Sequence, residues 1–149
     1  MMKRYLPGLI SIAVIASDQL SKAAVSSAVA LGQSTPVLKN IFHISLVHNT
    51  GAAFGLFKNQ NIPFIALSIA VILYLTRDLI LNGLRYNLTR SISLGLVLGG
   101  AAGNLGDRLR LGYIVDFLDF RIWPVFNIAD SAITIGIMLL AIDILKHKV

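Results

Sequence analysis

Four long apolar blocks, separated by short polar stretches, set the strongest limit on how this chain can fold. They run from about residue 5 to 31, from 62 to 81, from 91 to 106 and from 125 to 145. A helix crosses a bilayer with roughly 20 apolar residues, because each residue advances the helix by about 1.5 Å. The first, second and fourth blocks reach this length, so we predict a membrane-spanning helix for each of them.

The third block is shorter, but its glycines are regularly spaced. Gly95, Gly99 and Gly103 recur at every fourth position and therefore lie on one face of a helix. Small residues on one face allow helices to approach closely within lipid. We therefore interpret this block as a buried central span. The predicted fold class is a mainly α, polytopic membrane protein with four transmembrane helices, forming a single domain over residues 1–149.

The composition agrees with a membrane protein and excludes several kinds of chemistry. Hydrophobic residues make up 56% of the chain and charged residues only 13%, whereas about a quarter of a soluble domain is charged. There is no cysteine, which excludes disulfides, thiolate catalysis and cysteine-ligated metals. Every acidic residue is an aspartate, so the H-E-x-x-H motif of metalloproteases is absent.

The basic residues indicate membrane topology, although the formal net charge of +6 could also suggest a nucleic-acid partner. They fall between the apolar blocks and not in one patch, so no nucleic acid is predicted. With four spans, the residues on one side are Lys3, Arg4, Arg77, Arg85, Arg90, Lys146 and Lys148. Because Lys and Arg favour cytoplasmic loops, we predict cytoplasmic termini and outward segments at about 32–61 and 107–124.

The first outward segment contains the pattern of a strand. In "IFHISLV", residues 41–47, Phe42, Ile44 and Leu46 alternate with His43 and Ser45. Alternation of this kind is typical of a half-buried strand. We predict a small β element on the outer membrane surface, between the first and second spans.

The first block also has an alternative interpretation as a secretory signal. Residues 28–30 have the A-x-A form of a cleavage site, and basic residues precede the apolar stretch. A retained span is favoured, because cleavage would leave Asp18 and Lys22 unexplained.

Two pairs of polar residues lie within the apolar blocks at helical spacing. Asp18 and Lys22 are four residues apart, so they share a helix face and can pair. Charges within a span are costly, so this pair either fixes the helix or supports an outward-facing site. Asn104 and Arg108 have the same spacing and can reach one place. The simpler interpretation of that stretch is an interfacial pair between Asp107 and Arg108.

Two further aspartates lie near the predicted outer boundary. The simplest interpretation of Asp116 is a solvated surface charge. Asn127 has the character of a helix N-cap, and Asp130 then completes a capping box. Alternatively, two close carboxylates can activate water and protonate a leaving nitrogen, because like-charge repulsion keeps one proton on the pair. Sequence spacing alone does not show that Asp116 and Asp130 meet.

Five short motifs occur in an order that resembles the lipoprotein signal peptidases, or signal peptidase II, of bacterial cytoplasmic membranes. They are "DQLSK" at 18–22, "HNTGAAFG" at 48–55, "GGAAGNLGDR" at 99–108, "IVDF" at 114–117 and "FNIAD" at 126–130. The resemblance implies an aspartic endopeptidase with its active site near the outer face. Such an enzyme removes signal peptides from diacylglyceryl-modified prolipoproteins and cuts before the lipidated cysteine.

The resemblance also implies roles for particular residues and partners. Asp116 and Asp130 correspond to the catalytic pair. The residues that line or support the site would be Asn49, Gly51, Asn104, Arg108, Asn127, Ala129, Asp18 and Lys22. The resemblance also implies prolipoprotein substrates, contact with membrane lipids, a globomycin-type inhibitor and an outward β-cradle. It implies no metal and no organic cofactor. We expect the protein to be a monomer. The alternative function is a small proton- or ion-coupled transporter that uses intramembrane carboxylates.

Overall fold

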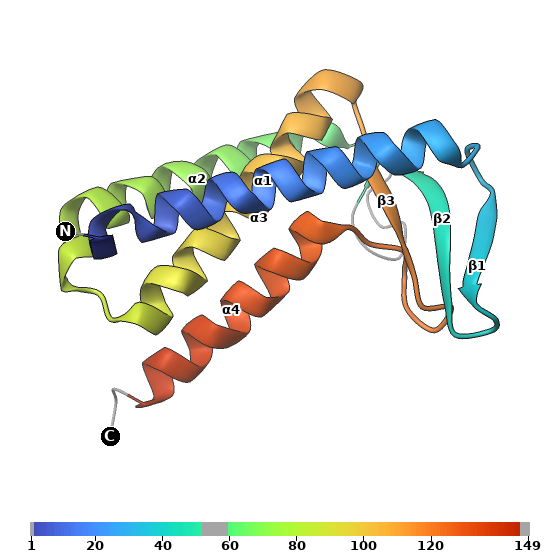
Figure 1. Ribbon diagram of the computed structural model, residues 1–149. Helices are drawn as coiled ribbons and strands as arrows, with labels where there is room; N and C mark the ends of the chain where they lie inside the picture. Colours follow the sequence, from blue (N-terminus) through green and yellow to red (C-terminus); the bar gives the residue numbers. More distant parts are fainter. Residues whose placement is uncertain (1, 52–59, 147–149) are drawn as a thin grey trace.

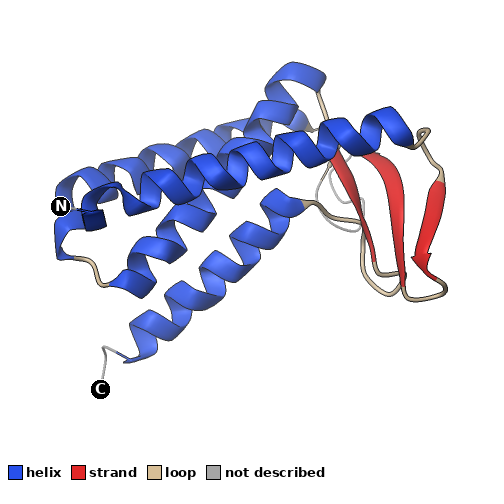
Figure 2. Cartoon of the chain, in the orientation of Figure 1, coloured by secondary structure: helices blue, strands red, loops and turns tan. Residues whose placement is uncertain are grey.

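The computed structural model of the chain describes residues 2–51 and 60–146, with side chains from residue 5 onward. Long helices form most of the structure, and a small sheet is attached at one end of them (Figure 1; Figure 2). The helices are α1 (Met2–Ala28), α2 (Asn61–Asn82), α3 (Leu88–Leu111) and α4 (Ile128–Lys146), and a short 3-10 turn, η2 (Gly83–Arg85), follows α2. The beginning of α1 and the end of α4 both lie away from the sheet.

Three helices in the described part of the chain are long and apolar enough to cross a membrane. They comprise Tyr5–Ala28, Asn61–Arg85 and Ile128–Lys146. The helix α3 has 24 residues but is less apolar than these three. It packs against α1, α2 and α4 and is therefore the centre of the bundle. A helix whose faces contact other helices needs less apolar surface than a helix that faces lipid, which accounts for the polar content of α3.

The glycines of α3 allow the close packing that their spacing predicts. A Cβ atom on Gly95 would lie 2.8 Å from the carbonyl oxygen of Pro7, and one on Gly99 would lie 2.8 Å from that of Ser11. Both contacts are too short for a real side chain, so α1 and α3 can approach this closely only at glycine. The prediction of a buried central helix is confirmed.

The ends of the helices differ from the predicted boundaries. The third span was expected to stop at residue 106, but α3 continues to Leu111 before Gly112 ends it. Gly112 has a φ of 81° and its N–H donates to the carbonyl of Arg108, a left-handed C-cap that suits a residue without a Cβ. Residues 107–111 are therefore helical and not part of an outward loop. The first helix ends at Ala28, and α4 begins at Ile128.

The sheet has three antiparallel strands in the order β1 (Ser34–Leu38), β2 (Phe42–Asn49) and β3 (Ile114–Asp119). The strand expected at residues 42–47 is confirmed as β2. The β element predicted between the first two helices is present as β1 and β2, and a third strand that was not predicted, β3, joins it from between α3 and α4. Most of β3 is buried on both faces, so it lacks the alternation that identifies a half-buried strand.

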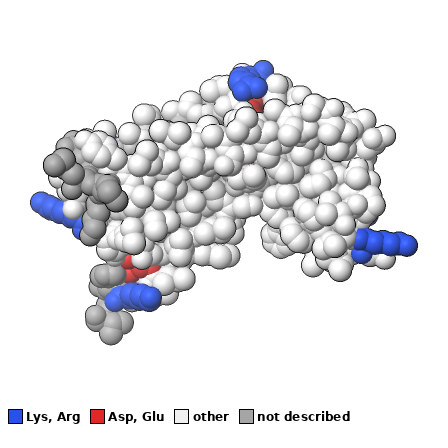
Figure 3. Space-filling model, viewed as in Figure 1, with Lys and Arg blue, Asp and Glu red and all other residues white. Residues whose placement is uncertain are grey.

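Charged side chains avoid the middle of the helices. On the face shown in Figure 3, Lys and Arg lie toward the helix ends and at the tip of the sheet, and the surface between them is uncharged. The exposed apolar residues of the helices include Leu9, Ile12, Leu67, Leu73 and Ile137. An uncharged surface on this face, together with the exposed apolar residues of the helices, fits contact with lipid.

Candidate active site

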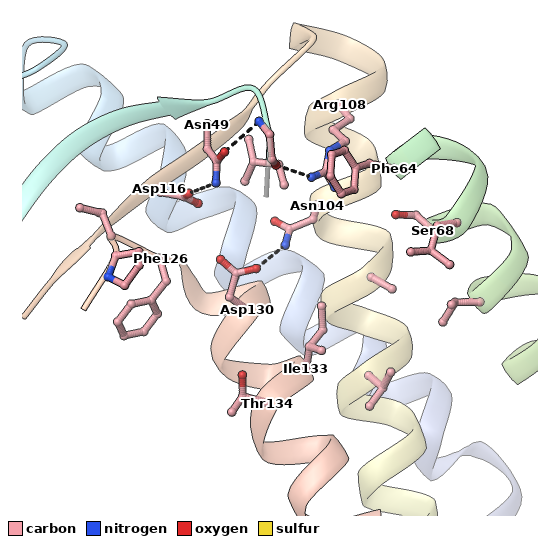
Figure 4. A pocket seen from close by; sticks show the side chains of 18 of the residues that line it. Asn49, Phe64, Ser68, Asn104, Arg108, Asp116, Phe126, Asp130, Ile133 and Thr134 are labelled. Carbon is pink, nitrogen blue, oxygen red and sulfur yellow. Dashed lines mark hydrogen bonds between the residues drawn. The ribbon is translucent and has the colours of Figure 1, made fainter. Parts of the chain in front are cut away.

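The two aspartates singled out from the sequence, Asp116 and Asp130, line one cavity of about 540 Å³. Asp116 comes from β3 and Asp130 from the first turn of α4, so the cavity lies where the sheet meets the helices (Figure 4). Asp116 is only 2% exposed. The fold therefore brings together two carboxylates from different elements, which the sequence alone could not establish.

Asn127, the residue immediately before α4, contacts both aspartates. Its side-chain oxygen accepts from the N–H of Asp130 at 2.8 Å, and its own N–H donates to Asp130 Oδ2 at 3.3 Å. These reciprocal bonds confirm the predicted capping box. The amide nitrogen of Asn127 also donates to Asp116 Oδ1 at 2.7 Å. One buried amide thus fixes the positions of both carboxylates.

Two other asparagines supply one donor to each carboxylate. Asn49, at the end of β2, donates from Nδ2 to Asp116 Oδ2 at 2.9 Å. Asn104, on α3, donates from Nδ2 to Asp130 Oδ1 at 2.8 Å. Each carboxylate therefore has hydrogen-bond donors on both of its oxygens, which holds its orientation toward the cavity.

Arg108 lines the same cavity and contacts the segment that follows β2. Its Nη2 donates to the carbonyl of Gly51 at 3.1 Å, and its guanidinium carbon lies 4.7 Å from the ring centroid of Phe64 on α2. Asn104 and Arg108 do reach one place, as their spacing predicts. Residues 52–55 of the motif "HNTGAAFG" lie outside the described residues. Phe64 was not identified as a site residue from the sequence. It lies in the first turn of the apolar helix α2, where no motif separates it from its apolar neighbours.

The paired charges of α1 do not line this cavity but contact residues next to it. Lys22 and Asp18 form an ion pair at 2.7 Å, as their spacing predicts, and both are buried. Lys22 also donates to Asn104 Oδ1 at 3.0 Å, and Asp18 accepts from the N–H of Ala129 at 2.9 Å. Through these contacts Asp18 and Lys22 reach Asn104 and the backbone of Ala129, which precedes Asp130.

The simple expectation of a pair between Asp107 and Arg108 is wrong. Asp107 is 2% exposed and pairs with Lys22 at 2.7 Å. It continues the stripe of Gly95, Gly99 and Gly103 by one more step of four residues, so it faces α1 instead of the cavity. That spacing is the sequence signal that identifies its partner.

The surroundings of Asp116 favour its protonated form. Burial, and then the neighbouring charge of Asp130, raise the pKa of Asp116 from 3.8 to about 7. Hydrogen bonds from Asn49 and Asn127 and the charge of Lys22 act in the opposite direction but do not cancel this effect. Two carboxylates in one low-dielectric site that retain one proton near neutral pH can act together as acid and base.

Two other aspartates have separate structural roles. Asp119, at the end of β3, accepts from Ser45 at 2.7 Å and pairs with Arg121 at 3.1 Å. Asp143, near the end of α4, accepts from Asn87 at 2.5 Å. In the parts of the chain that are described, no three His or Asp side chains gather in a way that could hold a metal ion.

The cavity continues from the two aspartates along the helices as an apolar channel. Its helical walls come from α2, α3 and α4, with α3 between the other two (Figure 4). The apolar wall residues are Phe64, Leu67, Val71, Val97, Ala101, Ile133 and Ile137. Leu67 and Ile137 are more than half exposed on the helix surface. An extended apolar substrate can therefore reach the carboxylates from the side of the bundle.

The fold corresponds to that of known membrane proteins. Two solved structures, each described as a bacterial membrane enzyme, superimpose on this chain. The first has a TM-score of 0.87 and 32% identity, and covers 95% of this chain and 88% of its own. The second has a TM-score of 0.83 and 33% identity, and covers 94% and 92%. The protein is therefore a multi-pass membrane enzyme.

The model of the family described as signal peptidase (SPase) II matches residues 10–146. The chain belongs to the signal peptidase II family and is a protease. The lipoprotein signal peptidase of Halothermothrix orenii is 42% identical over 145 residues, covering 94% of this chain and 95% of the relative. That of Moorella thermoacetica is 46% identical over 142 residues, covering 92% and 91%. These matches support the peptidase interpretation and give no support to the transporter alternative.

Proposed function

We propose that this protein removes signal peptides from diacylglyceryl-modified prolipoproteins by cutting before the lipidated cysteine, with Asp116 and Asp130 as its catalytic pair. The observation that carries the proposal is the shared contact with Asn127, which holds both carboxylates at the wall of one cavity. The names of the relatives supply the substrate class. No metal and no organic cofactor take part in the proposed reaction.

The proposed reaction needs one proton shared by the catalytic pair. The ionised carboxylate takes a proton from a water molecule while the oxygen of that water attacks the scissile carbonyl carbon. The protonated carboxylate stabilises the developing oxyanion, and a proton passes to the leaving nitrogen as the C–N bond breaks. The products are a carboxylic acid and an amine, and the pair again holds one proton. Because the two groups are coupled, their pKa values belong to the pair.

The supporting residues orient this pair and the substrate. Asn49, Asn104 and Asn127 direct N–H donors at the carboxylate oxygens and so fix the positions of the oxygens without supplying a proton. Arg108 lies beside the pair and holds the backbone at Gly51. In the proposal, the apolar channel receives the hydrophobic part of the substrate, because its walls are apolar and open toward lipid.

The proposed setting is the bacterial cytoplasmic membrane. In this proposal α3 crosses the membrane together with α1, α2 and α4, and the catalytic pair lies near the outer face. Support comes from the helix ends, since α1 begins and α4 ends away from the sheet. The basic residues near those ends favour the cytoplasmic side. We propose that the protein works as a monomer in contact with membrane lipids and that globomycin-type compounds inhibit it by occupying the cavity.

The test is cleavage of a lipidated prolipoprotein by purified protein in detergent or nanodiscs. Asp116→Asn and Asp130→Asn should each abolish cleavage and leave a folded protein. Asp119→Asn is the matched control, because Asp119 is also buried on β3 but bonds to Ser45 and Arg121. Substantial cleavage by either catalytic variant would rule out the aspartic mechanism. A transporter would instead produce ion flux in vesicles and no cleavage.

A further inference from the structure

Lys22 joins two buried carboxylates that come from different helices. Its ammonium lies 2.7 Å from Asp18 on α1 and 2.7 Å from Asp107 on α3. The three residues, called the charge triad below, have exposed fractions of 0%, 3% and 2% for Asp18, Lys22 and Asp107. Buried charges are costly even when paired, and an apolar cluster of the same volume often gives equal or greater stability. The triad therefore requires an explanation beyond packing.

The first carboxylate of the triad holds the backbone of α4. Asp18 uses Oδ2 for Lys22 and Oδ1 to accept from the N–H of Ala129 at 2.9 Å. Ala129 has an exposed fraction of 0% and immediately precedes Asp130. Asp18 thus fixes the backbone of the residue that precedes one member of the catalytic pair.

The second carboxylate holds the backbone of β3 in the same way. Asp107 uses Oδ2 both for Lys22 and to accept from the N–H of Val115 at 3.2 Å. Val115 immediately precedes Asp116, the other member of the catalytic pair. The other oxygen of Asp107, Oδ1, accepts from the side chain of Gln19 at 2.9 Å. Both carboxylate oxygens of Asp107 are therefore held by hydrogen-bond donors.

We propose that the charge triad sets the separation of the catalytic pair, with Asp18, Lys22 and Asp107 acting as positioning residues. This inference rests on the proposed function of the pair. Two carboxylates fixed by one ammonium fix in turn the backbone of the two residues that immediately precede the catalytic side chains. The same ammonium also donates to Asn104, which bonds Asp130. Such fixed positions matter for catalysis, because a misplacement of reacting groups by about 1 Å can lower the reaction rate by about 10²-fold.

A substitution that preserves every charge can test this geometry. A Cβ atom on Gly103 would lie 2.9 Å from Asp18 Oδ2, too close for an ordinary contact, so Gly103→Ala should displace that carboxylate. On the same helix, a Cβ atom on Gly106 would meet nothing within 4 Å. Gly106→Ala is therefore the matched control.

The experiment measures kcat, KM and the pH profile of prolipoprotein cleavage for Asp18→Asn, Asp107→Asn and Gly103→Ala. Asp18→Asn leaves one acceptor oxygen for two donors, Lys22 and the N–H of Ala129, that Asp18 bonds through separate oxygens. Asp107→Asn removes the charge that pairs with Lys22 and one of the two acceptor oxygens. Each of the first two variants therefore weakens one arm of the triad. We expect kcat to fall by about 10²-fold with KM changed by less than about threefold. Asp119→Asn and Gly106→Ala should retain the kcat of the unmodified protein.

The pH profile separates positioning from a loss of folded protein. A smaller folded fraction lowers the whole profile without moving its limbs. A changed separation alters the repulsion between the two carboxylates, so the interval between the two apparent pKa values of kcat should change. If the Asn variants do not fold, Gly103→Ala decides the question alone.

Failure of this inference is distinct from failure of the proposed function. Active Asp116→Asn or Asp130→Asn would overturn the proposed function. If both are inactive while folded triad variants keep kcat and an unchanged pH profile, the catalytic pair stands and the positioning role is wrong.

Discussion

Asn127 and Asp130 exchange two hydrogen bonds across the first turn of α4, one at 2.8 Å and the other at 3.3 Å. From the sequence, a capping box and a catalytic role are two alternative explanations for Asp130. Here they are the same geometry, because the amide that caps the helix also donates to Asp116 at 2.7 Å. The helix start fixes the proposed acid–base pair.

This double role can be separated by two substitutions of Asn127. Serine is a good N-cap, but its single hydroxyl oxygen cannot occupy both the place of Oδ1, which accepts from Asp130, and that of Nδ2, which donates to Asp116. Alanine can make neither bond. Asn127→Ala should lose about 1 kcal/mol of stability relative to Asn127→Ser, the usual cost of an N-cap. Both variants should lose roughly 10- to 100-fold in kcat, since a hydrogen bond to a charged group contributes about 1.5–3 kcal/mol.

Thermal unfolding in detergent gives the stability difference, and prolipoprotein cleavage gives kcat. Full activity of Asn127→Ser would show that the helix cap alone is needed and that the contact with Asp116 has no role in catalysis.

The pH dependence of cleavage should follow the titration of the catalytic pair. Burial, and then the charge of Asp130, raise the pKa of Asp116 to about 7. A carboxyl with a raised pKa keeps its proton below that value and loses it above. The form with one shared proton therefore disappears as pH rises through about 7, and kcat/KM, which reports the free enzyme, should fall there.

Asp119→Asn is the control for this profile. Burial raises the pKa of Asp119, but hydrogen bonds from Ser45 and Arg121 outweigh it and hold that pKa below 3.8. This residue does not titrate near pH 7, so its variant should keep the same high-pH limb. Cleavage that continues to rise well above pH 7 would contradict a shared proton.

Some parts of the site could be predicted from the sequence because they depend on local spacing. The pairing of Asp18 with Lys22 and the capping box at Asn127 both follow from positions three or four residues apart. The glycine stripe of α3 likewise required only helical periodicity. Such contacts are decided within one element and need no knowledge of the tertiary structure.

The meeting of Asp116 and Asp130 depends on long-range contacts that periodicity does not specify. It requires β3 to pair with β2, in the register that places Val47 opposite Asp116, and α4 to dock on α3. The strand itself was missed because both of its faces are buried. The role of Asp107 was missed because its neighbour in sequence, Arg108, offered a simpler partner.

Arg108 should be sensitive to replacement by lysine even though the charge is kept. Its guanidinium donates to Gly51 and lies over Phe64, and within the described residues its buried Nε has no hydrogen-bond partner. Because Arg108 lines the cavity, we propose that its guanidinium donates to a substrate carbonyl. Lysine lacks the planar fork and cannot make these contacts together. We expect KM for a prolipoprotein to rise about tenfold, the effect of one charged hydrogen bond.

Arg110→Lys is the matched control, because Arg110 is exposed and its Nη1 donates to Gln19 at 3.2 Å. Equal KM values for the two lysine variants would mean that Arg108 does not contact the substrate.

The close packing of α1 on α3 should make Gly99 intolerant of even one added methyl group. A Cβ atom there would lie 2.8 Å from both Ser11 O and Val14 Cβ, and backbone cannot move aside as a flexible side chain can. Gly99→Ala should therefore destabilise the protein by about 1–3 kcal/mol, the usual cost of overpacking. Gly8→Ala on α1 meets nothing within 4 Å and should be neutral or slightly stabilising, because alanine favours helix over glycine. Unfolding followed by circular dichroism in detergent compares the two variants, and equal stability would show that the helices can separate without cost.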